Sequence, residues 1–572
     1  MMKLAIVGFG PRGLHALENL FLELSKIKTS NKIDISLFET HKELGSGKVW
    51  DTQQADLNLV NISERGLQDL QGRNEINYQQ FVIPNFPSYT DWCFENDRAD
   101  KKDVDTFPPR NKIGNYLKER CKSILKVLEK ENCVQTYNTL ITDINQKKEK
   151  LILKDIDKNQ YEFDEVLLTI GHQTTEIPKD IKKYQENALN GNFICLPNVY
   201  PIQKIIDFEA ENKNIAIRGF GLAMIDAVRA LTIGNGGKFV YKKPTNFESE
   251  FKTSNKIPNK IIPYSLDGLP VIPKPLSEKI DNQFAVSKEQ LKAFENRIRE
   301  VANNKENVRD NSFLIEEYAK ITANIFLNIY YRREEDDLTE EDIKNVIFKW
   351  LTNQEFKHKL IQKTNIPTEK LIYNYVQMAC GKKKISLDFC AGQVIRHCQP
   401  TLYKSFSHAA ISEEIIADVI QFDEKMKRYS YGPPLESMQQ LLALHKANIL
   451  DFSVVDNPNI QFTKNGWIFE KDNHEIRVDC IIDSVLSSPE LLKVNTPIIK
   501  NLLRNDVIQP IHSKLGIHTN TNGTIIFDDK KTNASISVLG RLAKGSVIGV
   551  DAILECFGPR VNDWAKGLVS RI

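Results

Sequence analysis

A glycine-rich turn near the start of the chain limits the possible folds more than any other feature. Residues 3–7 are a short apolar run, residues 8–13 read Gly-Phe-Gly-Pro-Arg-Gly, and apolar residues recur at helical spacing from Leu14 to Leu24. Residues 33–38 then read as a second strand. This succession of strand, glycine turn, helix and strand is a βαβ unit, which predicts an α/β fold with a parallel sheet.

The turn satisfies the pattern G-x-G-x-x-G, and each of its glycines has a mechanical role. Gly8 permits the tight turn, Gly10 lets the backbone approach a pyrophosphate, and Gly13 lets the helix pack against the strand. The helix N-terminus offers partial positive charge to the phosphates. Glu39 closes the second strand, where its carboxylate can accept hydrogen bonds from ribose hydroxyls. The predicted dinucleotide contacts are Gly8, Gly10, Pro11, Arg12, Gly13 and Glu39.

A second βαβ opening follows in the middle of the chain. A strand is predicted at 214–218 and leads into a turn with Gly219 and Gly221 and then into a helix. The third glycine position holds Met224, which departs from the pattern and would push the helix away from the strand unless the turn is relaxed. We still predict a second nucleotide site at Gly219 and Gly221.

The strand predicted at 238–242 bears on the choice of nicotinamide cofactor. It leads into Lys242 and Lys243, at a place where sites that prefer NAD usually carry an acid. Two lysines there favour the 2′-phosphate of NADPH, although NADH is possible and a solvated surface pair is the alternative interpretation.

Two nucleotide-sized units predict two Rossmann-like dinucleotide-binding domains, each of three layers, with a large helical insertion. We assign residues 1–185, completed by 475–572, to a FAD-binding domain and 186–284 to an NAD(P)-binding domain. Residues 285–474 are helix-rich and lysine-rich over most of their length, and we expect this insertion to form the wall of a substrate pocket.

Composition excludes several classes of function. The 77 Lys and Arg residues nearly balance the 75 Asp and Glu residues, so no long-range field would draw the chain to nucleic acid or to an anionic membrane. The nine cysteines are dispersed without a C-x-x-C motif, which is typical of a reducing compartment. No leader, bilayer-spanning run or metal-binding motif is apparent, so we expect a cytoplasmic protein without a metal site.

Several further motifs accompany the two glycine turns. They are Gly45-Ser-Gly-Lys-Val-Trp50, Leu57-Asn-Leu-Val-Asn61, Phe107-Pro-Pro-Arg110 through Leu117, Leu168-Thr-Ile-Gly171-His172, Arg218 through Asp226, Gly236 through Phe239, Arg428-Tyr-Ser-Tyr-Gly432-Pro-Pro434, and Gly540-Arg541 through Asp551. Their order resembles the FAD-NAD(P)-binding family related to flavin-dependent N-hydroxylating and other class B monooxygenases. That family includes amino-acid N-oxygenases of the nitrosuccinate synthase type.

The resemblance implies that FAD binds the first glycine turn and also contacts Trp50 and Asn61. Trp50 could equally be a core residue, whereas Asn61 offers a donor and an acceptor to the flavin edge. Gly171 ends a strand where flavoproteins of this type pass the backbone close to FAD. The segment from Gly540 to Asp551 resembles the closing FAD motif, with Asp551 in the first turn of a helix.

Four arginines in or near the matched segments are candidates for binding a substrate carboxylate. Arg110, Arg396, Arg428 and Arg541 could each form bidentate hydrogen bonds with a carboxylate. Cofactor phosphate or a structural acid is the alternative partner for each of them. No catalytic residue is assigned.

The leading hypothesis is a FAD-dependent, NADPH-using monooxygenase that N-hydroxylates a small amine or amino acid with O2. The segment 193–201 lacks the F-x-G-x-x-x-H motif of many class B monooxygenases, which leaves oxygen activation open. One alternative is therefore an NAD(P)H-dependent flavin oxidoreductase or oxidase without oxygen transfer. The other is a non-catalytic FAD-binding sensor. Substrate and oligomeric state are left open.

Overall fold

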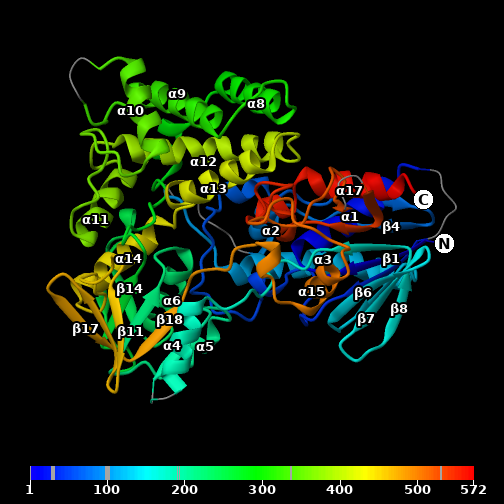
Figure 1. Cartoon of the computed structure of the whole chain (residues 1–572), viewed down its shortest axis with the longest axis horizontal. Helices are drawn as coiled ribbons and strands as arrows, with labels where there is room; N and C mark the ends of the chain where they lie inside the picture. Colours follow the sequence, from blue (N-terminus) through cyan, green and yellow to red (C-terminus); the bar gives the residue numbers. More distant parts are fainter. Residues whose placement is uncertain are drawn as a thin grey trace.

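The computed structural model describes residues 2–27, 33–96, 104–189, 191, 193–334, 338–527 and 531–572. It contains two mainly parallel sheets, which lie at opposite ends of the molecule, and a group of helices that lies beside the second sheet and reaches toward the first (Figure 1). The predicted α/β class, with two Rossmann-like units and a helical insertion, is confirmed. Within the described ranges, no helix is both long enough and apolar enough to cross a lipid bilayer.

The first unit is built on a six-stranded sheet with the predicted βαβ opening at its centre. The strand order is β19-β20-β9-β1-β2-β5, and all neighbours run parallel except β19 and β20. The strands are β1 (Met2–Val7), β2 (Ile33–Phe38), β5 (Val134–Tyr137), β9 (Glu165–Leu168), β19 (Thr524–Phe527) and β20 (Lys531–Val538). The order changes direction between β1 and β9, which is where open parallel sheets bind ligands.

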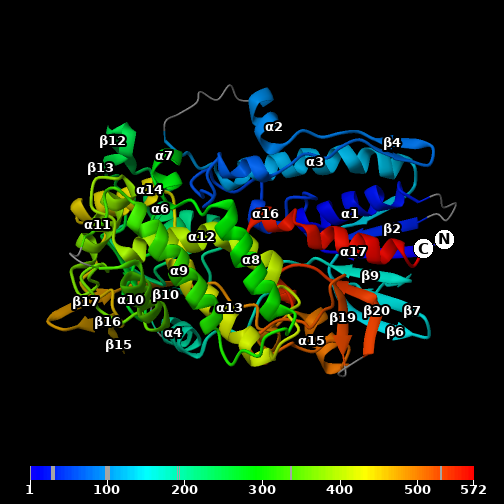
Figure 2. The same ribbon diagram turned by 90° about the horizontal axis from the view of Figure 1, so that it is seen from above.

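The two faces of this sheet are covered by different layers. Helices α1 (Pro11–Leu24), α3 (Arg110–Lys130) and α17 (Pro559–Val569) share one hydrophobic core with it. The opposite face is covered by α15 (Pro497–Arg504) and an antiparallel sheet of β6 (Ile141–Lys147), β7 (Lys150–Asp155) and β8 (Gln160–Phe163). This unit therefore has three layers, with β-structure in place of most helices on one face (Figure 2).

The segment between β2 and α3 packs its apolar residues into the core of the first unit. Its short elements are β3 (Ile76–Tyr78), β4 (Phe81–Ile83), α2 (Tyr89–Asn96) and the 3-10 turns η1 (Lys48–Trp50) and η2 (Gly66–Asp69).

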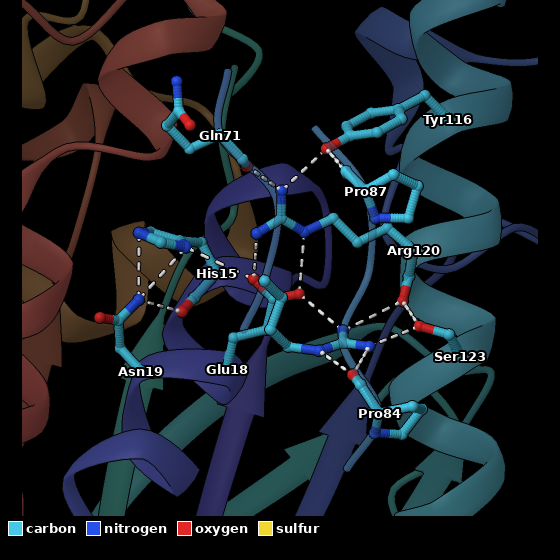
Figure 3. A network of polar contacts seen from close by, with 10 residues as sticks. His15, Glu18, Asn19, Gln71, Pro84, Pro87, Tyr116, Arg120 and Ser123 are labelled. Carbon is cyan, nitrogen blue, oxygen red and sulfur yellow. Dashed lines mark hydrogen bonds and ion pairs between the residues drawn. The ribbon is translucent and has the colours of Figure 1, made fainter. Parts of the chain in front are cut away.

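A buried ion-pair network fixes this segment to α1 and α3 (Figure 3). Glu18 is 3% exposed and receives two hydrogen bonds from Arg120, Nε–Oε1 at 2.9 Å and Nη2–Oε2 at 2.8 Å. Arg73 adds a third, Nη1–Oε1 at 2.8 Å. Burial alone would raise the pKa of Glu18, but Arg120, His15 and Arg73 together outweigh that effect and hold the pKa far below its ordinary value. Both arginines also donate to backbone carbonyls, so the buried charges are satisfied.

The second unit has a four-stranded parallel sheet of order β10-β18-β11-β14. Its strands are β10 (Ile194–Leu196), β11 (Asn214–Arg218), β14 (Lys260–Tyr264) and β18 (Cys480–Asp483). One face shares a core with α6 (Leu222–Thr232). The other face packs against α4 (Lys179–Leu189) and the antiparallel sheet of β15 (Asn459–Thr463), β16 (Gly466–Lys471) and β17 (His474–Val478).

The strand predicted at 238–242 exists but lies outside this parallel sheet. β12 (Lys238–Lys243) forms an antiparallel hairpin with β13 (Glu248–Lys252), and β14 takes the place beside β11. The physical reason is burial, because a parallel strand is covered on both faces. β14 offers Ile261 and Ile262, which are fully buried, whereas β12 is mostly exposed.

The boundary predicted at residue 475 is also displaced. β18 pairs with β10 and β11, so the chain stays in the second unit until Asp483 and returns to the first unit only afterwards.

The predicted insertion contains seven helices of eight or more residues in the described ranges. They are α8 (Lys288–Ala302), α9 (Ser312–Asn328), α10 (Glu340–Thr352), α11 (Thr368–Ala379), α12 (Leu387–Phe406), α13 (Glu413–Ser430) and α14 (Leu435–Lys446). They share one continuous core with α6 and β11 of the second unit. α12 and α13 extend from that core toward the first unit (Figures 1 and 2).

Candidate functional site

The first glycine turn lies at the switch point of the six-stranded sheet, and its glycines are required for different reasons. Gly8 has φ +84°, and a Cβ there would lie 2.8 Å from Ile170 Cα. A Cβ on Gly13 would lie 2.9 Å from Gly8 O, so a side chain would separate α1 from the turn. Gly10 is different, because its Cβ would meet only Gly47 Cα at 3.7 Å and Gly47 N at 4.0 Å. The backbone beside Gly10 is thus open, as a pyrophosphate requires.

Glu39 follows β2 and points its carboxylate at this turn. It accepts hydrogen bonds from the backbone N–H groups of Phe9 at 2.6 Å, Thr40 at 2.7 Å and His41 at 2.9 Å. The acid is therefore held beside the glycine turn, where a ribose of a bound dinucleotide would meet it. Its contact with a ribose stays a prediction.

The other N-terminal motifs are brought together around η1. Trp50 is partly buried against the core of the first unit, and its carbonyl lies where a Cβ on Gly114 would be. The absence of that Cβ lets α3 approach the Trp50 backbone. Asn61 donates from Nδ2 to the Tyr431 carbonyl at 3.4 Å, which joins the first unit to the turn after α13.

The backbone at Gly171 and Gly540 lies beside the first turn. Thr169 N donates to Val7 O at 2.9 Å, and Gly171 follows with φ +62° and open space where a Cβ would be. Gly540 has φ +103°, and the Arg12 guanidinium occupies the place of its missing side chain. Arg12 thus connects the first glycine turn to the closing motif. The neighbouring His172 is exposed.

Asp551 forms an ion-pair cluster that joins the closing motif to the helical insertion. It contacts Arg541 and lies 2.8 Å from Lys427 Nζ on α13 and 3.9 Å from Lys544 Nζ. Burial alone would raise the pKa of Asp551, but the Lys427 and Arg541 charges hold it well below its usual range. The helix predicted to start near this residue begins only at Ile553, as α16 (Ile553–Cys556), so Asp551 precedes it.

A chain of buried hydroxyl and carboxyl groups lies next to this cluster. Tyr403 OH donates to Asp423 Oδ2 at 3.1 Å and lies 3.2 Å from Tyr431 OH, which donates to Glu555 Oε1 at 3.3 Å. Burial raises the pKa of both carboxyl groups. The chain connects α12 and α13 to the closing motif, and it could hold or move a proton between these elements.

The second glycine turn has the same backbone geometry as the first. Gly219 has φ +104° and its N–H donates to Tyr264 O at 2.7 Å, just as Gly8 donates to Phe38 O at 2.8 Å. Apart from Gly221 and its chain neighbours, no atom of the described residues lies within 4 Å of the place where a Cβ on Gly221 would be. Met224 is fully buried in the core beside α6, so the turn accommodates it. The second turn is thus open to a phosphate as well.

The basis for the predicted role of Lys242 and Lys243 is wrong. Both lie on the β12–β13 hairpin, where Lys242 pairs with Glu250 and Lys243 Nζ lies 3.5 Å from Glu248. Both ammonium groups thus face glutamates of the hairpin, and their contact with NADPH stays a prediction. By the matching hydrogen bonds of the two turns, Ser265 is the residue that corresponds to Glu39.

Each of the four candidate substrate arginines has a carboxylate partner. Arg110 Nη2 lies 2.6 Å from Asp226 Oδ2, and Arg428 Nη2 lies 2.6 Å from Asp267 Oδ2. Arg396 contacts Asp281, and Arg541 contacts Asp551. Arg110 and Asp226 also bond to Tyr200 and connect α3 to α6, so this pair has a structural role at the junction of the two units. The four do not converge on one carboxylate.

The sequence-based prediction missed Lys427, Asp423, Tyr403, Tyr431 and Glu555, which the structure places beside the closing motif. Tyr431 lies in a motif that was noted, but its contacts with Asn61 and Glu555 come from residues more than a hundred positions away. No local pattern identifies such partners.

Comparisons with known proteins agree with this geometry. Residues 5–173 match the model of a family described as FAD-NAD(P)-binding. An L-aspartate N-monooxygenase (nitrosuccinate-forming) of Streptomyces davaonensis is 22% identical over 258 residues, which cover 41% of this chain and 39% of that protein. The uncharacterized protein YdhS of Escherichia coli is 21% identical over 249 residues, which cover 41% of this chain and 40% of that protein. The chain thus spans about two fifths of the length of these curated relatives.

A search of solved structures finds a crystal structure of cyclohexanone monooxygenase in an open form. It is 11% identical, with a TM-score of 0.45, over 100% of this chain and 88% of that chain. The match of residues 5–173 confirms the predicted resemblance of the first unit to FAD-NAD(P)-binding proteins.

Proposed function

We propose that this protein, whose residues 5–173 match the model of a FAD-NAD(P)-binding family, is an NADPH-dependent flavin monooxygenase that N-hydroxylates an amino acid. The observation that carries the proposal is the pair of open glycine turns, at Gly10 and Gly221, each at the carboxyl end of a parallel strand. The partial match to an L-aspartate N-monooxygenase supports the choice of an amino acid.

The residues of the first unit would hold FAD. The turn from Gly8 to Gly13 would bind its diphosphate, Glu39 its ribose, and the backbone at Gly171 and Gly540 would lie beside the rest of the cofactor. When bound, FAD supplies hydride acceptance from NADPH and the activation of O2. In the overall reaction, one oxygen atom enters the substrate N–H bond and the other leaves as water, with NADPH supplying two electrons.

The chain's own groups would position the reactants and handle protons. The Gly219–Gly221 turn would hold the diphosphate of NADPH, and the buried Asp423–Tyr403–Tyr431–Glu555 chain would accept or deliver protons near the closing motif. α12 and α13 would exclude water from that side of the site.

The proposal is tested by following NADPH oxidation with each of the twenty amino acids, together with oxygen uptake and product mass. We expect one amino acid to stimulate NADPH oxidation and to yield a product heavier by one oxygen atom. Oxidation that is unaffected by every amino acid, and that yields only reduced oxygen, would instead favour the oxidase alternative.

Replacing Gly221 with valine is expected to weaken NADPH binding without affecting FAD binding. Gly221 has φ −108° and open space beside it, so valine fits the protein but fills the place of the NADPH diphosphate. We expect full FAD content. The efficiency of anaerobic flavin reduction by NADPH should fall about 100-fold or more, which corresponds to about 3 kcal/mol of NADPH binding free energy. Stopped-flow measurement of flavin bleaching against NADPH concentration checks this. Unchanged reduction would show that NADPH binds elsewhere.

A further inference from the structure

A line of hydrogen bonds joins two carboxyl groups through two tyrosines, and we call it the tyrosine relay. It runs from Asp423 Oδ2 to Tyr403 OH at 3.1 Å, from there to Tyr431 OH at 3.2 Å, and on to Glu555 Oε1 at 3.3 Å. Asp423 and Tyr403 are buried, at 4% and 6% exposure. Besides these contacts and Asp423 Oδ1, no group in the described part of the chain forms a hydrogen bond with either hydroxyl.

The tyrosine relay lacks one hydrogen when both of its carboxyl groups are ionised. Each tyrosine hydroxyl has one hydrogen to donate, and a carboxylate has none. If Tyr403 and Tyr431 both donate to the carboxylates, their two oxygens face each other at 3.2 Å with no hydrogen between them. A protonated carboxyl group at one end supplies the missing hydrogen, because each hydroxyl can then donate to the next oxygen along the relay. The geometry therefore requires one acid and one carboxylate.

The Glu555 end is the one that favours the carboxylate. Its Oε2 accepts a hydrogen bond from the backbone N–H of Ala552 at 3.0 Å. Glu555 also lines a small cavity together with Arg12 and Arg560, whose positive charges favour an ionised neighbour. Gly540 lines the same cavity, so this end of the relay faces the predicted FAD site.

The Asp423 end is the one that favours the acid. The cations around it already have carboxylate partners, since Lys427 Nζ lies 2.7 Å from Glu424 and 2.8 Å from Asp551 and Lys544 contacts Glu424 as well. Burial raises the pKa of Asp423, which acts in the same direction. With the hydrogen on Asp423, the relay is directed from Asp423 through both tyrosines to Glu555.

We propose that the tyrosine relay stores one proton on Asp423 and delivers it through Tyr403 and Tyr431 to Glu555, beside the predicted FAD site. The use of that proton rests on the proposed function, in which each turnover consumes one proton because NADPH supplies two electrons with a single hydrogen. In the transfer, the Asp423 O–H bond breaks, each tyrosine oxygen gains a proton from one neighbour and passes its own to the next, and Glu555 becomes the acid. No electron moves within the relay.

The infrared spectrum of the oxidised holoprotein tests the stored proton without turnover. Ordinary carboxyl groups are ionised at about pH 7.5, so we expect a C=O band of a protonated carboxyl group that shifts in D2O. Asp423→Asn should remove the band and still fold, since its amide donates to Tyr403 as the acid does. Glu555→Gln should retain the band. Absence of the band in the unaltered protein, or its persistence in Asp423→Asn, would overturn the proposal.

The buried pair of Tyr375 and Asp388 is the matched control. Tyr375 OH donates to Asp388 Oδ2 at 2.8 Å, and the backbone N–H of Gln362 donates to Oδ1 at 2.8 Å. Every contact of this carboxyl group thus has a hydrogen without a proton on Asp388. Asp388→Asn should therefore leave the infrared band unchanged, and its loss there would assign the stored proton to Asp388 and contradict the proposal.

Delivery is tested by interrupting the relay with Tyr403→Phe. The protein is reduced anaerobically and mixed with aerated buffer, and flavin reoxidation is followed at several pH values. We expect reoxidation to slow at least about ten-fold at about pH 8.5 and far less at about pH 6.5, where protons from bulk water replace the relay. Tyr431→Phe should behave alike, and Tyr375→Phe should follow the unaltered protein. Parallel pH profiles for Tyr403→Phe and the unaltered protein would overturn delivery.

Other titratable groups surround the relay and are common to all these variants, so the difference between the profiles reports the relay. The groups that act electrostatically on Asp423 are Lys427, Glu424, Lys544 and Tyr318, and those that act on Glu555 are Asp551, Arg12, Lys427, Arg560 and Cys556.

These outcomes are distinct from a failure of the proposed function. The infrared band depends only on the resting protein, whereas the proposed function requires NADPH to reduce the flavin. If NADPH does not reduce the unaltered protein, the proposed function fails whatever the band shows. If NADPH reduces it and the band is absent, only the stored proton is refuted.

Discussion

Replacing Gly10 with valine is expected to give a folded protein that no longer retains FAD. Gly10 has φ −85° and ψ −160°, a conformation that valine adopts readily, and a Cβ there would lie 3.7 Å from Gly47 Cα, an ordinary contact. The protein therefore tolerates the side chain. The diphosphate does not, because the methyl groups occupy the space through which it approaches the backbone and the N-terminus of α1.

We expect FAD affinity to fall by about 100-fold or more, which corresponds to about 3 kcal/mol of binding free energy. The purified variant should therefore be colourless. Titration of apoprotein with FAD, followed by flavin fluorescence, measures the loss. Gly221→Val is the matched control, since it places the same side chain in the second turn and should leave FAD content intact. A yellow Gly10→Val protein with normal affinity would show that FAD does not lie on this turn.

Replacing Glu18 with glutamine is expected to destabilise the first unit by about 3–5 kcal/mol. The substitution leaves the Arg73 and Arg120 guanidinium groups buried without a counter-charge, and both are nearly inaccessible, at 5% and 2% exposure. Urea unfolding of the purified variant measures the change. Glu129→Gln, which neutralises an exposed glutamate on α3, is the matched control and should change stability by less than about 0.5 kcal/mol.

The same network predicts a pH dependence of stability. The pKa of Glu18 is depressed in the folded state, so its contribution is complete well above its ordinary pKa of 4.5 and is lost as the pH falls below that value. Between about pH 7 and pH 3, the unaltered protein should therefore lose more stability than Glu18→Gln does. Parallel pH profiles for the two proteins would contradict the role given to this carboxylate.

The features that the sequence could predict are those encoded locally. The first glycine turn, the strand before it and the helix after it depend on residues within about twenty positions of one another, and β11 was predicted with its observed bounds, 214–218. The open backbone beside Gly10 and Gly221 follows from the same local pattern.

The features that could not be predicted depend on distant partners. β12 has a plausible strand pattern, but the choice between it and β14 for the place beside β11 depends on which strand can be buried on both faces. Likewise, Glu18 meets Arg120 across 102 positions, and Asp281 meets Arg65 across 216.

Anaerobic titration of the purified protein with NADPH, followed by visible absorbance, tests the central claim most directly. The account predicts one FAD per chain whose absorbance is bleached by one equivalent of NADPH and returns when air is admitted. Folded protein that contains no flavin and takes up none, or bound flavin that NADPH does not bleach, would contradict it.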